Sequence, residues 1–293
     1  MKLKTNFWKN RISYLIILPA LILFAIFRIY PMLKSFYLSF FKFNITTESN
    51  FIGFQNYINL FTDNVFLNSI KVTFIFTFIS VPLIIIISLA IAMILDHPNL
   101  KGRNFFKALI FMPYITSGVV VSIIWKWFFN YRFGLINYII NIFGIESVNW
   151  LGSSKTALLC VMVVMVWKFS GFFMLIFYGN LTMIDKNLYE AADVDGANGI
   201  QKFIYITLNQ LRPAFSVSIL LATIYFFRAF EVVYNMTGGD PGGATNVLSY
   251  QIFTTAFRNL NFGVAFSGIV LMFIIVCILL IFQLLISEGK KYE

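Results

Sequence analysis

The sequence predicts an all-α membrane protein with six transmembrane helices and with both termini in the cytoplasm. Composition is the first observation behind this fold class. Of 293 residues, 59% are hydrophobic and only 12% are charged, and the mean hydropathy is +0.83. A water-soluble chain of this size needs about 25% charged residues to cover its surface. Lipid must therefore face much of the chain, and the 36 Phe and 14 Tyr suit a bilayer core and its interfaces.

The second observation is that six apolar segments are long enough to cross a bilayer, which takes roughly 20 residues of helix. They are residues 12–29, 72–95, 105–129, 156–178, 214–233 and 263–287. The first follows Lys2, Lys4, Lys9 and Arg11, as a secretory signal would. Its apolar run is too long for a signal, however, and no small-x-small cleavage site precedes Arg28. We expect an uncleaved first span and a single transmembrane domain over residues 1–293.

The third observation is the distribution of lysine and arginine, which sets the orientation. With the N-terminus inside, the cytoplasmic segments hold eleven of these residues in 61 positions, and the outer loops hold six in 97. This bias is what the positive-inside rule requires. The cytoplasmic segments are then 1–11, 96–104, 179–213 and 288–293, and the outer loops are 30–71, 130–155 and 234–262.

The net charge of +10 would also suit binding to nucleic acid. No basic run with interleaved aromatic residues lies outside an apolar segment, so we interpret the charge as topological. Cys160 and Cys277 each lie in an apolar run and are interpreted as small fillers rather than as a disulfide or a metal site. His97 lies in a short polar loop, where we expect it to be solvated. We predict no catalytic residue and no bound metal.

The longest cytoplasmic loop, residues 179–213, is predicted to form two short helices set at an angle. Asp185 can cap the first helix and Asn198 the second. Gly196 between them can adopt the left-handed conformation that ends a helix. Helices that lie on anionic lipid usually carry a basic face, whereas here acidic residues outnumber basic ones, which favours docking to a protein. The residues counted are Asp185, Glu190, Asp193 and Asp195 against Lys186 and Lys202.

The motif in this loop begins with Glu190-Ala191-Ala192, continues after three residues with Gly196, and ends after nine more with Ile206-x-Leu208. It resembles the EAA loop in the permease subunits of ABC importers. In that family the loop forms a coupling helix that sits in a cleft of the ATPase subunit. Asn209 stands where the family usually has proline, which implies a less rigid turn. The resemblance implies that the residues contacting the ATPase are Glu190, Ala191, Ala192, Asp193, Asp195, Gly196 and Ile206.

Further motifs resemble the carbohydrate branch of this family. Residues 51–57 (FIGFQNY) resemble its first outer loop, and residues 111–114 (FMPY) with Trp125-Lys126 resemble its third span. Trp167-Lys168 resembles part of its fourth span, and residues 237–242 (TGGDPG) resemble its last outer loop. Without the resemblance, residues 238–243 predict a tight turn outside the membrane. They do not predict a phosphate-binding loop, because the lysine and serine or threonine that end such a loop are missing.

Ionisable residues inside a span are costly and indicate a function or a paired partner. Lys126, near the outer end of its span, can extend to the interface, whereas Lys168 lies near the middle of its span. Arg228 and Glu231 stand one turn apart, so a mutual ion pair is an alternative to a direct role in solute binding.

In the resembled family the solute path follows the two spans that flank the EAA loop. This implies, for the present chain, the path residues Trp167, Lys168, Phe172, Tyr225, Phe226, Arg228 and Ala229. Aromatic faces there can stack on sugar rings while a few polar groups fix the orientation. Arg228 together with Lys168 would favour an anionic solute, such as a uronate oligosaccharide or a glycerol phosphate.

The chain carries no ATP-binding signature, so the resemblance implies a permease subunit that is not itself an enzyme and binds no cofactor. It would import a sugar, an oligosaccharide or a related solute across the bacterial cytoplasmic membrane. The implied partners are a second permease (identical or homologous), an ATPase dimer that uses ATP and Mg²⁺, an extracytoplasmic solute-binding protein and membrane lipid, without nucleic acid. The alternative is an ion-coupled secondary transporter of a small polar solute. That class needs paired acids in its spans or broken helices in matching halves, and Glu231 is the one acid in the six predicted spans.

Overall fold

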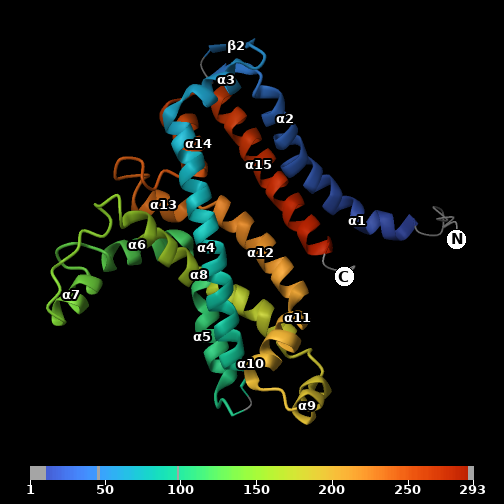
Figure 1. The fold of residues 1–293 in the computed structure, drawn as a ribbon. Helices are drawn as coiled ribbons and strands as arrows, with labels where there is room; N and C mark the ends of the chain where they lie inside the picture. Colours follow the sequence, from blue (N-terminus) through green and yellow to red (C-terminus); the bar gives the residue numbers. More distant parts are fainter. Residues whose placement is uncertain (1–10, 45–46, 98, 290–293) are drawn as a thin grey trace. The chain divides into compact units, whose positions relative to one another are not determined.

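The computed structural model describes residues 11–44, 47–97 and 99–289 (Figure 1). Residues 1–10 and 290–293, which carry much of the basic charge expected in the cytoplasm, lie outside the described residues. The chain divides into two compact units. One combines the residues up to Thr62 with Ile252–Phe273, and the other combines Asp63–Gln251 with the residues from Ile274 onward.

The first unit begins with a long apolar helix made of α1 (Arg11–Phe24), the π-helical turn η1 (Ala25–Ile29) and α2 (Tyr30–Leu38). The predicted span 12–29 is confirmed as helix, and the helix continues beyond it to Leu38. The wider π-helical turn just before Pro31 accommodates a ring that lacks an amide N–H. The most apolar stretch of this helix has no buried residue, so its side chains can contact lipid or another subunit.

A two-stranded antiparallel hairpin follows, which departs from the all-α expectation. The elements here are β1 (Phe41–Asn44), β2 (Thr47–Phe51) and α3 (Gln55–Thr62). Phe41 lies opposite Phe51 in the register of the two strands, and phenylalanine has a high strand propensity. Asn56 on α3 is buried, and its Nδ2 donates to the carbonyl oxygens of Ser39 and Phe41 at 2.8 and 2.9 Å. This asparagine therefore fixes α3 against the start of the hairpin.

The last helix, α15 (Phe262–Gly289), begins against the same hairpin and follows the π-helical turn η3 (Thr254–Arg258). A Cβ at Gly263 would overlap the carbonyl oxygen of Phe41, so only glycine permits this approach. Phe43 packs against Phe262 and Phe266, with ring centroids 6.3 and 6.1 Å apart. The predicted span 263–287 is confirmed as a single helix.

The second unit is organised around α8 (Ala157–Leu181), a continuous helix over the segment predicted as the span 156–178. The helices packed against it are α4 (Asn64–Asp96), α5 (Arg103–Ile115), α6 (Gly118–Phe128), α12 (Arg212–Phe227) and α13 (Glu231–Met236). Phe173 and Phe177 of α8 are fully buried. A Cβ at Gly171 would overlap the backbone of Ile110 in α5. Small residues allow this close packing in a membrane, where van der Waals contact drives helix association.

The second span begins earlier than predicted. α4 starts at Asn64 rather than at Val72, because Asp63 caps it by accepting a hydrogen bond from the Val65 amide at 2.8 Å. The polar residues Asn68 and Lys71 therefore extend a helix instead of ending one. Pro82 lies inside α4 without interrupting it.

The third span is not the single helix that was predicted over residues 105–129. α5 and α6 meet at an angle of 97°, and Thr116 and Ser117 between them are extended (Figure 1). Pro113 in the last turn of α5 cannot donate an amide N–H to the helix, which weakens it at this point. Among the described residues, five helices are long and apolar enough to cross a membrane, or six if this bent pair counts as one span.

The fifth span, predicted as one helix over residues 214–233, is also interrupted. α12 ends at Phe227 and α13 begins at Glu231, with Arg228, Ala229 and Phe230 between them. The Arg228 and Ala229 amides still bond back to Ile224 and Phe226, so the helix stops at its normal cap and a new one starts at Phe230. The freed carbonyl oxygen of Ala229 accepts a hydrogen bond from Ser249 Oγ at 3.1 Å. A side chain from another segment thus satisfies the backbone where the helix breaks, as non-helical backbone at membrane depth requires.

Short helices complete the second unit, and Asn137 organises one of them. They are α7 (Leu135–Ile142), α9 (Lys186–Val194), α10 (Gly199–Gln201), the π-helical turn η2 (Lys202–Thr207), α11 (Leu208–Gln210) and α14 (Leu248–Phe253), of which α14 runs into the first unit. The Asn137 amide donates to the carbonyl oxygens of Tyr131 and Val148, both at 3.0 Å. Its Oδ1 accepts from the Val148 amide and from Trp150 Nε1 at 3.1 and 2.8 Å. One buried side chain therefore holds the segment from residue 130 to 150 together.

Candidate functional site

Lys168 lies at the meeting point of the two interrupted spans. It is 8% exposed, and its Nζ donates to the carbonyl oxygens of Thr116 and Pro113, the latter at 3.4 Å. Both carbonyls stand at the end of α5, where no further helical turn is available to bond them. The sequence placed Lys168 too deep in its span to reach the interface, and the structure shows which groups it meets instead.

Glu231 lies on the other side of the break in the third span, at the start of α6. It is the first residue of α13, and a Cβ at Gly118 would overlap its carboxylate oxygen. Gly118 is the first residue of α6, so the carboxylate stands at the start of a helix, where the partial positive charge of the helix favours an anion. Lys126 ties the same two helices together, since its Nζ donates to the Asn235 carbonyl oxygen at 3.1 Å. This contact was not anticipated from its expected extension to the interface.

A cavity of 410 Å³ opens beside Lys168, between α8 and the break in the fifth span. It is lined by Met165, Lys168, Phe169, Tyr225, Arg228, Ala229, Phe230, Glu231 and Val232. The rings of Phe169 and Tyr225 lie 4.9 Å apart on its wall. Aromatic faces beside charged groups suit a sugar, because the rings contact the apolar face of the sugar while the charges orient its hydroxyls.

Arg228 and Glu231 form no ion pair with each other within 4.0 Å. The alternative of a mutual pair assumed one continuous helix, which would place them one turn apart. Since α12 ends before Arg228 and α13 begins with Glu231, that spacing is lost. Both side chains are exposed and both line the cavity, so both charges are open to a solute.

The structure divides the predicted path residues into two groups. Lys168, Tyr225, Arg228 and Ala229 line the cavity. The others lie around it: Phe172 packs against Tyr225 at 5.9 Å, Phe226 is fully buried against Phe76, and Trp167 is 43% exposed with its ring 5.4 Å from that of Trp125. The place of all seven residues on the solute path stays a prediction.

Sequence reasoning missed Phe169, Met165, Phe230 and Val232 as lining residues, and it considered Glu231 only as the pair partner of Arg228. Phe169 could have been found, because it follows Lys168 directly and lies one turn from Phe172. Phe230 could not, since its position depends on the break in the fifth span, which the sequence does not reveal.

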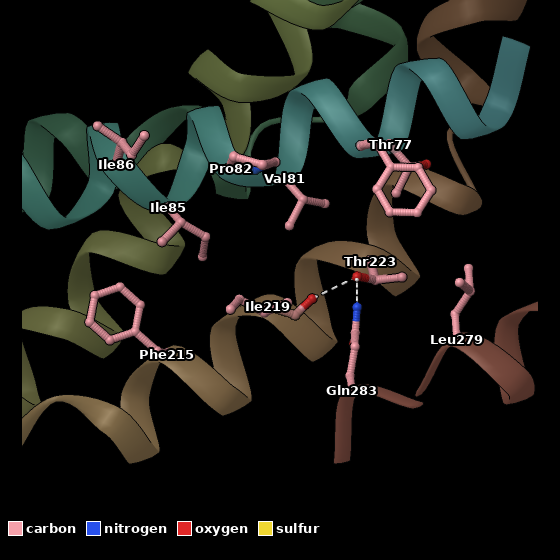
Figure 2. Close-up of a pocket in the computed structure, with 11 residues that line it drawn as sticks. Thr77, Val81, Pro82, Ile85, Ile86, Phe215, Ile219, Thr223, Leu279 and Gln283 are labelled. Atoms are coloured by element: carbon pink, nitrogen blue, oxygen red, sulfur yellow. Dashed lines mark hydrogen bonds between the residues drawn. The ribbon is translucent and has the colours of Figure 1, made fainter. Parts of the chain in front are cut away.

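A second cavity, of 420 Å³, lies between α4, α12 and the last part of α15 (Figure 2). Its wall is almost entirely apolar. Gln283 Nε2 donates to Thr223 Oγ1 at 2.8 Å, and Thr223 Oγ1 donates to the Ile219 carbonyl oxygen at 2.8 Å (Figure 2). The Thr77 hydroxyl and Gln283 Oε1 are buried without a hydrogen-bond partner. With no charged residue among its lining residues, this cavity suits a sugar less well than the one beside Lys168.

The cytoplasmic loop folds as predicted into two short helices around a glycine. Asp185 caps α9 by accepting a hydrogen bond from the Asn187 amide at 2.9 Å. Gly196 has φ +77°, and the amides of Gly196 and Ala197 bond back to Asp193 and Ala192 in a Schellman arrangement. Asn198 and Gln201 form a reciprocal capping box at the start of α10. Both predicted caps and the predicted helix end are therefore confirmed.

Two side-chain contacts hold the halves of this loop together. Lys202 forms an ion pair with Asp193, and the hydroxyls of Tyr189 and Thr207 lie 2.8 Å apart. Asp193 therefore makes an internal contact in addition to its predicted role in coupling. Asn209 continues the helix through α11, with its Nδ2 donating to the Tyr205 carbonyl oxygen at 2.6 Å.

Apolar and acidic side chains are exposed together on the loop. Val194 is 89% exposed and Ile200 is 71% exposed, and the carboxylates of Glu190 and Asp195 are exposed beside them in the sequence. Val194 and Ile200 therefore add apolar area to a loop surface that is otherwise polar and acidic. The loop is thus a compact knob with an apolar and acidic surface.

Comparisons with known proteins agree with this geometry. A family described as "Binding-protein-dependent transport system inner membrane component" matches residues 56–291. The chain is 34% identical, over 98% of its length and 97% of the relative's, to the trehalose/maltose transport system permease protein MalF of Thermococcus litoralis. It is also 34% identical to the sulfoquinovosyl glycerol transport system permease protein SmoG of Agrobacterium fabrum, over 87% of this chain and 84% of that one. A crystal structure of a bacterial ABC transporter for the acidic polysaccharide alginate has the same fold, with a TM-score of 0.85 over 99% of both chains at 22% identity.

Proposed function

Since this chain belongs to the family of binding-protein-dependent transport system inner membrane components, and is therefore the permease subunit of an ABC importer, we propose that it carries a sugar or an oligosaccharide past Lys168 and Arg228. The carbohydrate assignment is supported by the relatives, two of which are named for the transport of trehalose or maltose and of sulfoquinovosyl glycerol. We place the protein in the bacterial cytoplasmic membrane, with the loop 179–213 inside.

The observation that carries this proposal is the cavity beside Lys168. Its wall combines the rings of Phe169 and Tyr225 with the exposed charges of Arg228 and Glu231. Arg228 offers a planar set of N–H donors that can bond two oxygens at once. Glu231 offers acceptors for sugar hydroxyls. Such a wall binds a polyhydroxylated ring, and a carboxylate or phosphate on that ring would gain from Arg228.

The interruptions on either side of the cavity supply the movement that transport needs. α5 and α6 can change their angle at Thr116, and α12 and α13 can change theirs at Arg228, without unfolding a helix. Short non-helical segments of this kind absorb the backbone rotation of a hinge. Broken spans are also common in ion-coupled secondary transporters, the alternative raised by the sequence. Family membership decides between the two in favour of the importer.

Coupling to ATP is assigned to the loop knob. The exposed Val194 and Ile200 supply apolar contact, and Glu190 and Asp195 supply charge, for a cytoplasmic ATPase that would bind ATP and Mg²⁺. The caps and the Schellman turn keep the knob rigid. A movement of the ATPase would therefore be transmitted to the transmembrane helices instead of deforming the knob. A second permease and an extracytoplasmic solute-binding protein complete the proposed complex. The exposed Trp167, whose ring lies against the half-buried Trp125, is a candidate for contact with the second permease.

Co-purification tests this proposal. The tagged chain is solubilised in mild detergent from the membranes of its native host, and the bound proteins are identified by mass spectrometry. We expect an ATPase, a second permease and a solute-binding protein, and we expect ATP hydrolysis that rises when the binding protein carries its sugar. A purified complex without an ATPase contradicts the proposal. So does a rate of ATP hydrolysis that no sugar-loaded binding protein increases.

A further inference from the structure

The short helix α7 turns its polar side toward its own chain and its apolar side away from it. On the inner side Asn137 is buried, and it bonds to the backbone on both sides of the helix. The outer side consists of four large residues that are 45–67% exposed, namely Leu135, Tyr138, Ile139 and Ile142. Their spacing places them on one face of the helix. A helix at a surface that faces only water has the reverse arrangement, so this outward face is suited to apolar surroundings.

The outward face of α7 continues an exposed stripe on α6. The large exposed side chains of α6 fall on one side of that helix and are Val119, Val120, Ile123, Ile124 and Trp127. The ring centroid of Trp127 lies 5.8 Å from that of Phe133, which is exposed just before α7 begins. Because α6 is the outer half of the broken third span, we assign its exposed stripe to the bilayer. The two aromatic rings then carry the lipid-facing surface from α6 to α7 (Figure 1).

The connection between the two helices is short and held by hydrogen bonds. Asn130 Oδ1 accepts from the amides of Arg132 and Phe133 at 2.9 and 3.3 Å. A Cβ at Gly134 would overlap the carbonyl oxygens of Phe128 and Asn130, so only glycine permits this tight turn. Together with the buried Asn137, these contacts fix the direction in which α7 presents its outward face.

The residue types around α7 are those of a membrane–water interface. Trp127, Tyr131 and Tyr138 are exposed, and tryptophan and tyrosine gather at this depth because they combine an apolar ring with a polar tip. Arg132 is the one residue between positions 127 and 145 that carries a formal charge, and it is exposed. Its long side chain can extend to lipid phosphates while the backbone stays at the interface.

A protein partner fits the outward face of α7 less well than lipid does. Helices that pack together inside a membrane usually meet through small residues, as α5 and α8 do in this chain at Gly171. The outward face of α7 has only large residues, which argues against the second permease. A solute-binding protein must leave after each delivery, and transient interfaces are more polar than this face.

We propose that α7 is an interfacial anchor that lies in the headgroup region of the outer leaflet, with Leu135, Tyr138, Ile139 and Ile142 toward the acyl chains. Short amphipathic helices bind a membrane in this way without crossing it. The anchor would hold the end of α6, and with it the outer half of the third span, at the membrane surface. It does not depend on which solute the protein carries.

Spin labels test this placement in the full chain, purified with its partners and reconstituted in lipid nanodiscs. With Cys160 and Cys277 replaced, one label is attached at Ile139→Cys or Ile142→Cys on the outward face, and a control label at Glu146→Cys, which is exposed beyond it. Collisions with oxygen report contact with lipid, and collisions with a water-soluble nickel chelate report contact with water. We expect the ratio of oxygen to nickel collisions to be about fivefold higher on α7 than at position 146, at a depth of about 5–10 Å.

A substitution on the same face provides a second readout. With the label at position 142, Ile139→Asp should raise the nickel collisions about threefold, because a carboxylate is costly in lipid and draws α7 toward water. Ile139→Leu keeps an apolar side chain and should leave the collisions unchanged.

Three results would overturn the anchor. Nickel collisions at positions 139 and 142 as frequent as at position 146 would place the outward face in water. Labels that neither oxygen nor the nickel chelate reaches would place this face against a protein partner. A depth near the centre of the bilayer would make α7 part of a span rather than an anchor at the surface. Because the two labelled positions are separate and exposed, either one decides the question if the other variant does not assemble.

Discussion

The ammonium group of Lys168 on α8 donates a hydrogen bond to the carbonyl oxygen of Thr116, the residue at which the third span breaks. The contact explains how a charge can lie in the middle of a span and how a helix can break there. Each feature alone would be costly in a membrane, since a buried cation needs acceptors and freed carbonyls need donors. Together they satisfy one another.

Replacing Lys168 by Met should therefore destabilise the break. The carbonyl oxygens of Pro113 and Thr116 would lose their donor, at a cost of about 1–3 kcal/mol in the free energy of unfolding. We expect a lower melting temperature for the purified chain, together with reduced uptake of its solute. Lys168→Arg keeps a cationic donor and serves as the control. A Lys168→Met protein that melts with the parent and transports normally would show that the contact is dispensable.

The wall of the cavity leads to a prediction about the ring of Tyr225. Tyr225→Ala should lower uptake about threefold to tenfold, because a stacking face worth about 0.5–1.5 kcal/mol is lost. Tyr225→Phe keeps the ring and should retain most of the activity. Initial rates of radiolabelled sugar uptake measure both variants. Equal uptake by Tyr225→Ala and by the parent would exclude this wall from the solute path.

Arg228 provides a separate test of charge. Arg228→Gln should raise the KM for a uronate oligosaccharide or a glycerol phosphate about tenfold, because a charge-assisted hydrogen bond is lost. The KM for a neutral sugar should change far less. Uptake of a neutral and an anionic sugar, each delivered by its binding protein, gives the two values. The same fractional change for both solutes would mean that Arg228 does not select for charge.

The sequence was sufficient for the apolar spans and for the loop knob, because both depend on local chemistry. Apolar runs, the caps Asp185 and Asn198, and the glycine at 196 act within a few residues of themselves. The breaks depend on distant partners. Pro113 weakens α5 but does not by itself predict a break, since Pro82 lies inside an unbroken α4. At Thr116 the freed carbonyl oxygen is satisfied by Lys168, a residue from another helix.

The second break carries still less local signal. Residues 228–230 include neither proline nor glycine, and the Ala229 carbonyl is satisfied by Ser249, which lies 20 positions away in the sequence. The cavity could be predicted only in part for the same reason. Lys168, Tyr225 and Arg228 were implied by the resemblance to the permease family, whereas Phe230 joins the wall only because the helix stops before it.

Gly196 and Gly199 form a matched pair for testing the knob. A Cβ would meet no atom within 4 Å at either position, but only Gly196 has a positive φ. Gly196→Ala should therefore strain the backbone by about 1–2 kcal/mol, whereas Gly199→Ala should not. We expect a loss of ATPase co-purification in Gly196→Ala, and more so in Gly196→Val, with normal levels in the membrane. Equal behaviour of the two alanine variants would show that the left-handed turn does not shape the contact.

Asn137 leads to a prediction about stability. Asn137→Leu leaves the Tyr131 and Val148 carbonyls and the Val148 amide without their partner in a site where the parent side chain is 2% exposed. The free energy of unfolding should fall by about 2–4 kcal/mol, given about 1–3 kcal/mol for each buried group left unsatisfied. Asn141→Leu, on the same helix but at an exposed position, is the control. Thermal unfolding of the two purified variants gives their melting temperatures. Equal melting temperatures would mean that the hydrogen bonds of Asn137 matter only locally and do not contribute to the stability of the whole chain.

Cysteine labelling tests the orientation. With Cys160 and Cys277 replaced, Asp195→Cys should resist a membrane-impermeant thiol reagent in intact cells, and Asp240→Cys should react. Both positions are exposed on the protein, so a difference in labelling reports which side of the membrane each one faces. Labelling of position 195 from outside would reverse the assignment of the two faces.

ATP-driven uptake tests the central claim most directly, because it requires the knob, the cavity and the partners to act together. The chain is reconstituted into liposomes with its ATPase and second permease, ATP is enclosed in the lumen, and the sugar-loaded binding protein is added outside. We predict that the sugar accumulates only when both ATP and the binding protein are present. Glu190→Lys should abolish this accumulation, because it places a repelling charge at the ATPase contact. Accumulation that continues without ATP and stops when a proton gradient is collapsed would contradict the account.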